Sequence, residues 1–177
     1  LALGGYAPPS TTRLTCSEEY NGSSWSPGGV LITGRSYSTS FGLQNAALSF
    51  GGLVPGVSSA VEEYNGTSNT TIDSITTGRF ALGGAGTTNS GVIFAGDTPT
   101  ATASTEEYDG TSWSVQSQMR TARSYVGNAG ASAAEAAAFG GYTPSYSPDT
   151  ELFSAFCSTT LCSSLPVWSA AAHMLAH

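Results

Sequence analysis

The sequence predicts an all-β protein assembled from stacked repeats, and three observations carry that prediction. First, one phrase occurs three times, 44 residues apart, as SEEYNGSSWS, VEEYNGTSNT and TEEYDGTSWS at residues 17–26, 61–70 and 105–114. Second, a short apolar run ending in small residues returns with nearly the same period. Third, helix formers are scarce and lysine is absent, while Gly, Ser, Thr and short runs of Tyr, Phe and Val dominate. A fixed period of this length is typical of a repeat architecture.

Four extended segments are expected in each repeat. A recurring Arg leads the first, as in residues 123–130, and the second is the apolar run, found as ALGG, LSFGG, VIFAG and AAFGG at residues 2–5, 48–52, 92–96 and 137–141. Branched and aromatic side chains favour a pleated strand, and the glycines that follow end it and permit close backbone approach. Asn-Gly or Asp-Gly at positions 21–22, 65–66 and 109–110 predicts a type I′ turn. Glu-Glu-Tyr and Ser-Trp then become the two arms of a hairpin.

The Asn turn residues also fall in N-x-S/T sequons. Asn21, Asn65 and Asn69 open these sequons. Two interpretations stand for them: turn or repeat residues without a glycan, or acceptor sites if the source is a secreted eukaryotic protein.

The repeated charges predict structural ion pairs. Arg35, Arg79 and Arg123 recur 44 residues apart, in the same phase as the Glu pairs. Adjacent residues on a strand point to opposite faces, so a Glu pair is not a carboxylate dyad. One Glu of each pair is therefore expected to meet a repeated Arg, and Glu63 and Glu107 are assigned to the structural repeat.

The repeated aromatic residues predict where the units pack. A single unit cannot bury both faces of its sheet, so stability is expected from neighbouring units. Trp25 and Trp113 are expected to pack between units, with Asn69 in place of the second Trp. Buried apolar-run residues are expected at equivalent strand positions, namely Phe50, Phe94 and Phe139.

Four units are expected in one domain: residues 1–34, 35–78, 79–122 and 123–172, with the last residues beginning another unit. The fourth hairpin is degraded to TELF at residues 150–153, and Trp168 and His173 are interpreted as late counterparts of Trp113 and Arg123. The first unit lacks its own first strand. A strand from Met174 onward, from chain outside this sequence or from a neighbouring molecule is expected to cover that edge.

Four strands in about 44 residues are typical of a propeller blade. The order of LSFGG, a variable loop, VEEYNG, a Trp and then an Arg ten residues later resembles the kelch family over nearly the whole chain. The wording of EEYNG with FGG is similar to kelch-like arrays in tail and fibre proteins of marine bacteriophages. The resemblance implies an all-β, kelch-like β-propeller of about four 44-residue, four-stranded blades, or a segment of a larger propeller. Asn69 for Trp and Ala95 for Gly depart from the pattern.

A rival propeller signature is the Asp box of sialidases. It needs a spacer between Asp and Gly, whereas Asp109 and Gly110 are adjacent. The Arg cluster and Tyr–Glu pair of those enzymes cannot be placed either, so the kelch resemblance is preferred.

Charge and motif content narrow the function. Twelve acidic residues against five Arg give a net charge of −7, which argues against nucleic-acid and anionic-membrane partners. No apolar stretch approaches 18 residues, so no membrane insertion is expected. Nucleophile elbow, phosphate loop and HExxH motifs are absent, and both His lie in the last five residues. The sequence therefore predicts neither enzyme activity nor a cofactor.

One cluster near the C-terminus has metal-ligand residue types. Cys157, Cys162, His173 and His177 have the spacing C-x4-C-x10-H-x3-H, near that of a zinc finger. The segment has no Lys or Arg, and His173 falls at the repeat Arg position, so no metal site is assigned and zinc stays the alternative. Cys157 and Cys162 as a disulfide or as free thiols both remain open, with Cys16 left over.

Specificity is expected in the loops between Gly-Gly and Glu-Glu, which are rich in Pro, Thr, Ser and Gly. They cover residues 6–16, 53–60, 97–104 and 142–149 and differ in sequence while the frame repeats. Binding concentrates on such loops. The tyrosines could stack on sugar rings or anchor their loops; the candidate binding residues are Tyr6, Pro55, Thr98, Tyr142 and Tyr146.

These observations favour a non-enzymatic structural and binding module. The resemblance implies a virion appendage, or another extracellular setting, that contacts a host surface. The implied partners are other virion or repeat-protein subunits, a host-surface glycan and a second copy of the chain. The alternatives are a secreted propeller enzyme acting on glycans, either a hydrolase or a copper oxidase, and a kelch adaptor domain.

Overall fold

The fold is all-β and antiparallel. The computed structural model describes residues 1–9, 11–154 and 167–170, and every regular element within them is a strand. The candidate metal residues Cys157, Cys162, His173 and His177, and a covering strand from Met174, lie outside the described residues.

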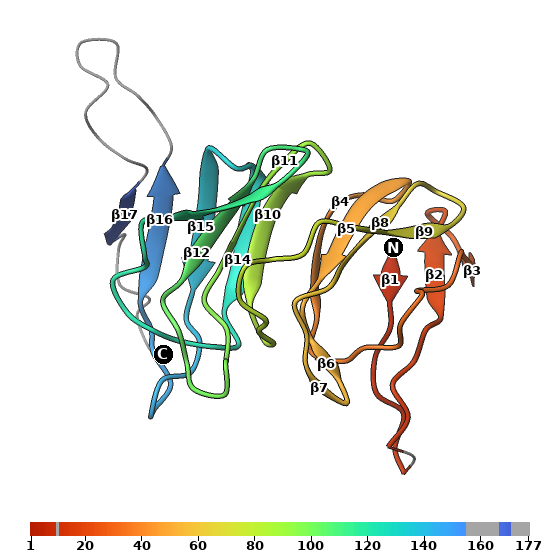
Figure 1. The fold of residues 1–177 in the computed structure, drawn as a ribbon, viewed down its shortest axis with the longest axis horizontal. Helices are drawn as coiled ribbons and strands as arrows, with labels where there is room; N and C mark the ends of the chain where they lie inside the picture. The colour runs from red at the N-terminus through yellow and green to blue at the C-terminus, as the bar shows by residue number, and fades with distance from the viewer. Residues whose placement is uncertain (10, 155–166, 171–177) are drawn as a thin grey trace.

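Four sheets follow one another along the chain, each ordered as its strands occur in the sequence (Figure 1). The first has three strands, β1 (Ala2–Leu3), β2 (Ser17–Tyr20) and β3 (Trp25–Pro27). The second has β4 (Thr39–Leu43), β5 (Ala46–Phe50), β8 (Val61–Tyr64) and β9 (Asn69–Ile72), with a small hairpin of β6 (Leu53–Val54) and β7 (Gly56–Val57) in its loop. The third has β10 (Gly83–Thr87), β11 (Ser90–Phe94), β12 (Thr105–Tyr108) and β13 (Trp113–Gln116). The fourth has β14 (Gly127–Ser132), β15 (Glu135–Phe139), β16 (Thr150–Ser154) and β17 (Val167–Ala170).

Each four-stranded sheet lies inside one of the expected repeat units. The first sheet has three strands, because within the described residues nothing pairs with the free edge of β1. In the other sheets the leading strands β4, β10 and β14 contact one another in turn. The described sheets do not close into a ring: the first and the last lie at opposite ends of the series (Figure 1).

The hairpin turns differ from the predicted type I′. Tyr64 pairs with Asn69, so the loop holds four residues rather than two. Gly66 has a positive φ of 91°, but Asn65 does not, and its side-chain Oδ1 accepts hydrogen bonds from the N–H groups of Thr67 and Ser68, both at 3.0 Å. Asn21 and Asp109 do the same. The Asn or Asp therefore acts through its side chain, as in an Asx turn.

The core lies between successive sheets. One cluster joins the second sheet to the third, and its fully buried members include Leu48, Phe50 and Ile93. A second cluster joins the third sheet to the fourth around Phe94. Phe139 ends its strand as Phe50 and Phe94 do, but it is only half-buried, since no described sheet follows the fourth.

The hairpin Trp packs on the Phe of the preceding sheet. The ring centroids of Trp113 and Phe50 are 6.1 Å apart, and those of Trp168 and Phe94 are 4.9 Å apart. Asn69 replaces this contact with hydrogen bonds from its Nδ2 to Gly29 O and Val30 O, at 3.0 and 3.1 Å. Trp25 does not pack between sheets as predicted: no described sheet precedes it, and it is 53% exposed.

Candidate functional site

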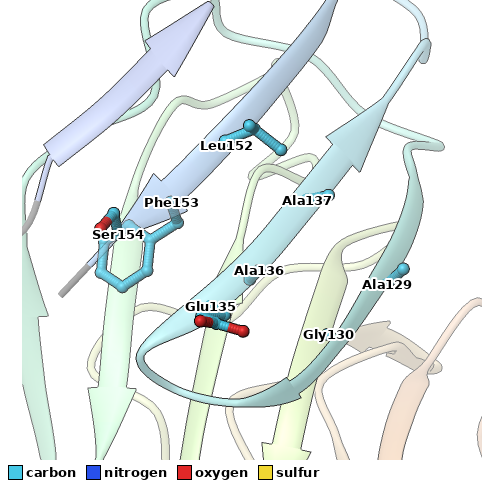
Figure 2. A pocket seen from close by; sticks show the side chains of 8 residues that line it. All are labelled: Ala129, Gly130, Glu135, Ala136, Ala137, Leu152, Phe153 and Ser154. Atoms are coloured by element: carbon cyan, nitrogen blue, oxygen red, sulfur yellow. The ribbon is translucent and has the colours of Figure 1, made fainter. Parts of the chain in front are cut away.

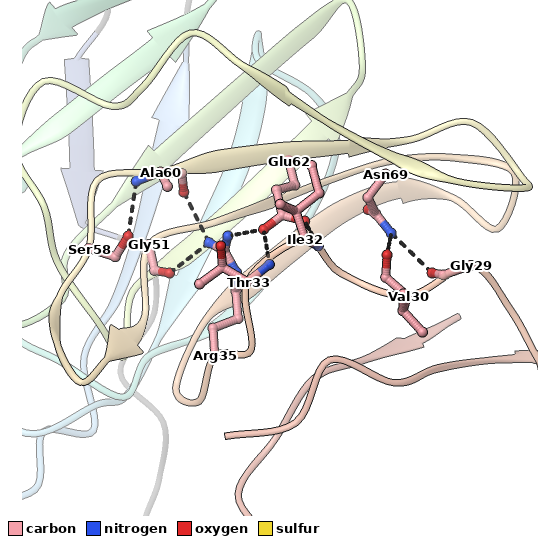
Figure 3. Close-up of polar contacts among 10 residues, drawn as sticks. All are labelled: Gly29, Val30, Ile32, Thr33, Arg35, Gly51, Ser58, Ala60, Glu62 and Asn69. Atoms are coloured by element: carbon pink, nitrogen blue, oxygen red, sulfur yellow. Dashed lines mark hydrogen bonds and ion pairs between the residues drawn. The ribbon is translucent and has the colours of Figure 1, made fainter. Parts of the chain in front are cut away.

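A buried arginine fastens each four-stranded sheet to the segment that enters it. Arg35 Nη1 donates to Gly51 O at 3.0 Å and to Ala60 O at 3.1 Å, and Nη2 forms an ion pair with Glu62 (Figure 3). Glu62 in turn accepts hydrogen bonds from the backbone N–H groups of Ile32 and Thr33, which precede the arginine. We call this set of contacts the arginine clamp.

The clamp recurs in the next two units. Arg79 bonds Ala95 O and Ser104 O and pairs with Glu106, which also accepts from Thr76 N. The last clamp repeats the pattern with Arg123, Gly140 O, Asp149 O, Glu151 and Arg120 N. All three arginines are fully buried, and burial lowers the pKa of the Arg79 guanidinium while Glu106 opposes that shift. The clamp carboxylates are occupied by structural partners.

The clamps use the first Glu of each pair, Glu62 and Glu106. Glu63 and Glu107, which the sequence analysis assigned to the structural repeat, take no part in these ion pairs. The second Glu lies on the opposite face of its strand, toward the next sheet. There Glu19 accepts a hydrogen bond from the hydroxyl of Tyr64. Phe153 stands where the partner of Glu107 would be, and it has no hydroxyl. Burial, and to a lesser extent Asp109, raises the pKa of the Glu107 carboxyl.

Two residues after each clamp arginine, the backbone adopts a strained conformation. Tyr37, Ala81 and Tyr125 have positive φ values of 54°, 52° and 55°. Ala81 N donates to Tyr37 O, and Tyr125 N donates to Ala81 O, both at 2.8 Å. Non-glycine residues in this region cost about 1–3 kcal/mol and tend to cluster at functional sites. Here the strain aims two tyrosine side chains outward: Tyr37 and Tyr125 are 54% and 55% exposed.

An aromatic cluster gathers around these two tyrosines. The rings of Tyr37 and Tyr125 meet edge to face at 6.1 Å, and Phe80 lies 6.3 Å from Tyr37. Ser124 and Tyr142 exchange backbone hydrogen bonds of 2.9 and 2.7 Å, which place Tyr142 next to Tyr125. Tyr146 meets Tyr142 edge to face at 5.7 Å. The cluster comprises Tyr37, Phe80, Tyr125, Tyr142 and Tyr146.

A hollow of about 480 Å³ lies on this cluster and is lined by Tyr125, Gly141, Tyr142 and Tyr146. Burial raises the pKa of the Tyr125 hydroxyl, with Tyr37 and Asp97 adding to the shift. The tyrosine is therefore neutral at physiological pH, and its hydroxyl can donate as well as accept a hydrogen bond.

The structure brings together two of the five residues expected to bind. Tyr142 and Tyr146 line the hollow, whereas Tyr6, Pro55 and Thr98 belong to three other loops and do not line it. Tyr37 and Tyr125 were not among the residues predicted to bind. Their signal was available in the RSY tripeptides at residues 35–37 and 123–125, which hold the same phase in the repeat.

Residues 1–9, 11–154 and 167–170 contain neither a metal centre nor a membrane-spanning helix. In this part of the chain no three His, Cys, Asp or Glu side chains converge as a metal site would require. The same residues contain no helix of the length and hydrophobicity needed to cross a membrane. The aromatic cluster is thus the leading candidate site in the described structure. No protein-family model matches the chain, and no curated protein is significantly similar to it.

Proposed function

We propose that this chain is a kelch-like β-propeller segment that acts as a non-enzymatic binding module, with carbohydrate as the ligand of its aromatic cluster. The observation that carries the proposal is the hollow lined by Tyr125, Tyr142 and Tyr146. Its floor is built on repeated backbone contacts, and its rim comes from a loop whose sequence differs from unit to unit.

The chemistry of the cluster suits a sugar. Tyr146 is 89% exposed and Tyr142 is 44% exposed, so their rings are available to a ligand. A tyrosine offers an apolar face to the C–H groups of a sugar ring and a hydroxyl to its oxygen atoms. Backbone bonds between Ser124 and Tyr142 fix part of the site before binding, which lowers the entropic cost of association.

Glycan binding can be tested on an array of surface polysaccharides, followed by calorimetry. Tyr142→Ala and Tyr146→Ala should each weaken binding at least about tenfold, which corresponds to about 1.4 kcal/mol. Tyr6→Ala is the matched control, since Tyr6 is 48% exposed in a different loop, and it should bind as the parent does.

Two results would contradict this proposal. One is a parent protein that binds no glycan at millimolar concentration, or binds it equally well without Tyr142 and Tyr146. The other is glycan turnover that a single substitution abolishes, which would favour the alternative of a propeller enzyme.

The setting we propose is a virion appendage, and it rests on the resemblance to kelch-like arrays of phage tail and fibre proteins. An antibody raised against the chain should label tails or fibres of intact virions in electron micrographs. Labelling confined to the host cell would instead favour an adaptor or a secreted protein.

A further inference from the structure

The two ends of the series of sheets carry complementary halves of one contact. Inside the chain, the hairpin Trp of the third and of the fourth sheet packs on the apolar-run Phe of the sheet before it. This occurs between Trp113 and Phe50 and again between Trp168 and Phe94. Within the described residues, the first sheet has the Trp without a Phe to receive it, and the fourth has the Phe without a Trp.

At the N-terminal end, Trp25 is already held in the geometry of its counterparts in the third and fourth sheets. Its ring centroid is 5.2 Å from that of Tyr20, with an interplanar angle of 38°. The equivalent pair of Tyr108 and Trp113 has values of 4.9 Å and 32°, and that of Phe153 and Trp168 has 5.3 Å and 51°. Trp25 is 53% exposed, whereas Trp168 is 7% exposed. The first sheet therefore presents an exposed Trp25 ring that is already oriented for packing against a Phe.

At the C-terminal end, no described residues cover one face of the fourth sheet. Ala129, Ala137 and Leu152 form a cross-strand row on β14, β15 and β16 (Figure 2). Phe139 lies on the same side of β15, since it is two residues beyond Ala137 in the strand. A hollow of about 430 Å³ extends along this row and reaches Glu135 at the strand end. The same face of the third sheet, around Phe94, receives Trp168.

One substitution adapts this face to an apolar partner. Leu152 occupies the position of Glu63 and Glu107 in the earlier units and is 43% exposed. Between the first and second sheets, the corresponding Glu19 accepts a hydrogen bond from the hydroxyl of Tyr64. The hydroxyl of Tyr20 needs no such partner, because it donates to Gly22 O at 2.9 Å. Contact between Leu152 and Tyr20 would leave no buried polar group without a partner.

We propose that the fourth-sheet face of one copy binds the first sheet of a second copy, with Trp25 docking beside Phe139 and Leu152. The contact is heterologous, since two different surfaces meet. Such contacts close into a ring when the rotation permits and otherwise extend as a filament. The proposal is independent of glycan binding, which uses a different surface.

Sedimentation velocity of the 177-residue chain over a range of concentrations tests the proposal. The parent should self-associate, and Trp25→Ala and Leu152→Glu should each raise the dissociation constant at least about tenfold. Both side chains are exposed, so circular dichroism should show an unchanged fold. Tyr146→Ala, an exposed aromatic residue outside both end surfaces, should associate as the parent does.

A mixing experiment identifies which surfaces meet. The Trp25→Ala chain keeps the fourth-sheet face, and the Leu152→Glu chain keeps the first-sheet face. Neither should associate alone, but an equimolar mixture should form a one-to-one heterodimer. A parent that stays monomeric, association that survives both substitutions, or a mixture that gives no heterodimer would each overturn the proposal.

Discussion

Each clamp arginine is a charged side chain that is fully buried from solvent. Arg79 is fully buried, and the compensating charge of Glu106 is buried with it. A buried ion pair contributes little compared with an apolar pair of the same shape, but it becomes very costly when one partner is removed. The clamps therefore act mainly as devices that fix the geometry of the entering segment.

Arg79→Met should lower the free energy of unfolding by about 3–5 kcal/mol, because it leaves Glu106 buried without a counter-charge. Urea denaturation measures the change. Arg120→Met is the matched control: its side chain is exposed, and it should stay within about 0.5 kcal/mol of the parent.

The double variant Arg79→Met/Glu106→Leu separates charge from packing. It should be more stable than Arg79→Met alone, since no unpaired charge remains. A single variant within about 1 kcal/mol of the parent would contradict the role assigned to the clamp.

Glu107 should make stability depend on pH in a defined direction. Its pKa is raised in the folded state by burial and Asp109, so the folded chain binds this proton more tightly than the unfolded chain does. Its contribution favours folding below the ordinary Glu pKa of about 4.3 and is lost as pH rises through the raised folded value. Glu107→Gln should flatten this part of the curve in denaturation measured between about pH 4 and 7.

Glu18→Gln, at an exposed carboxylate of the first sheet, is the control and should keep the parent's slope. Phe153→Tyr tests the cause of the raised Glu107 pKa by adding a hydrogen-bond donor beside the carboxylate. By supplying the hydroxyl that Tyr64 gives Glu19, it should lower the pKa of Glu107 in an NMR titration. An unchanged slope in Glu107→Gln would refute this account.

At the scale of the element, the hairpin of each unit serves the sheet before it. Tyr64 donates a hydrogen bond to Glu19 of the first sheet. Trp113 and Trp168 pack on Phe50 and Phe94 of their preceding sheets, so these hairpins hold neighbouring sheets together. Trp168 combines this packing with a hydrogen bond from its Nε1 to Thr105 Oγ1 at 2.9 Å. Trp113 instead donates to Asp73 O at 3.1 Å and stays partly exposed.

The three Trp residues should therefore differ in their contribution to stability. Trp168→Ala should cost about 3–5 kcal/mol, the range for a large buried aromatic residue. Trp113→Ala should cost less, and Trp25→Ala should be nearly neutral in dilute solution. Thermal or urea denaturation of the three variants gives the order, and equal losses for Trp25 and Trp168 would contradict it.

At the scale of the whole molecule, the free energy of unfolding is approximately a sum over the interfaces between successive sheets. At the interface between the second and third sheets, the Phe41 ring packs onto two glycines. It fills the space that a Cβ would need at Gly91 and lies close to the Cβ position of Gly84. Both glycines lie in strands and are buried, so here glycine provides room rather than backbone freedom.

Gly91→Ala should cost about 1–3 kcal/mol, because the added methyl group overlaps the Phe41 ring. Gly56→Ala is the control, since a Cβ there meets nothing within 4 Å. Adding Phe41→Ala to Gly91→Ala should give a double variant whose loss is smaller than the sum of the two single losses. Strict additivity in denaturation measurements would show that the two positions do not share this space.

The repeat predicted much of this fold because period, apolar runs and hairpin phrases all report strand pairing. It predicted that a Glu would meet each Arg, but not which one. Glu62 and Glu63 differ only in the face they point to, and that depends on sheet register. The aromatic cluster was half predicted. Tyr142 and Tyr146 share a loop, whereas Tyr37 and Tyr125 come together only when sheets stack.

The arginine clamp also bears on how the chain reaches this state. Each clamp joins residues 27 or 28 positions apart, and the two carbonyl groups that it binds lie within the same stretch. Closing so short a segment costs little chain entropy, and proteins rich in local contacts fold faster than those that depend on distant ones. Every unit can thus be pinned soon after it leaves the ribosome, before its downstream neighbour exists. Assembly can then proceed in the direction of synthesis, with each new hairpin adding to a sheet that is already in place.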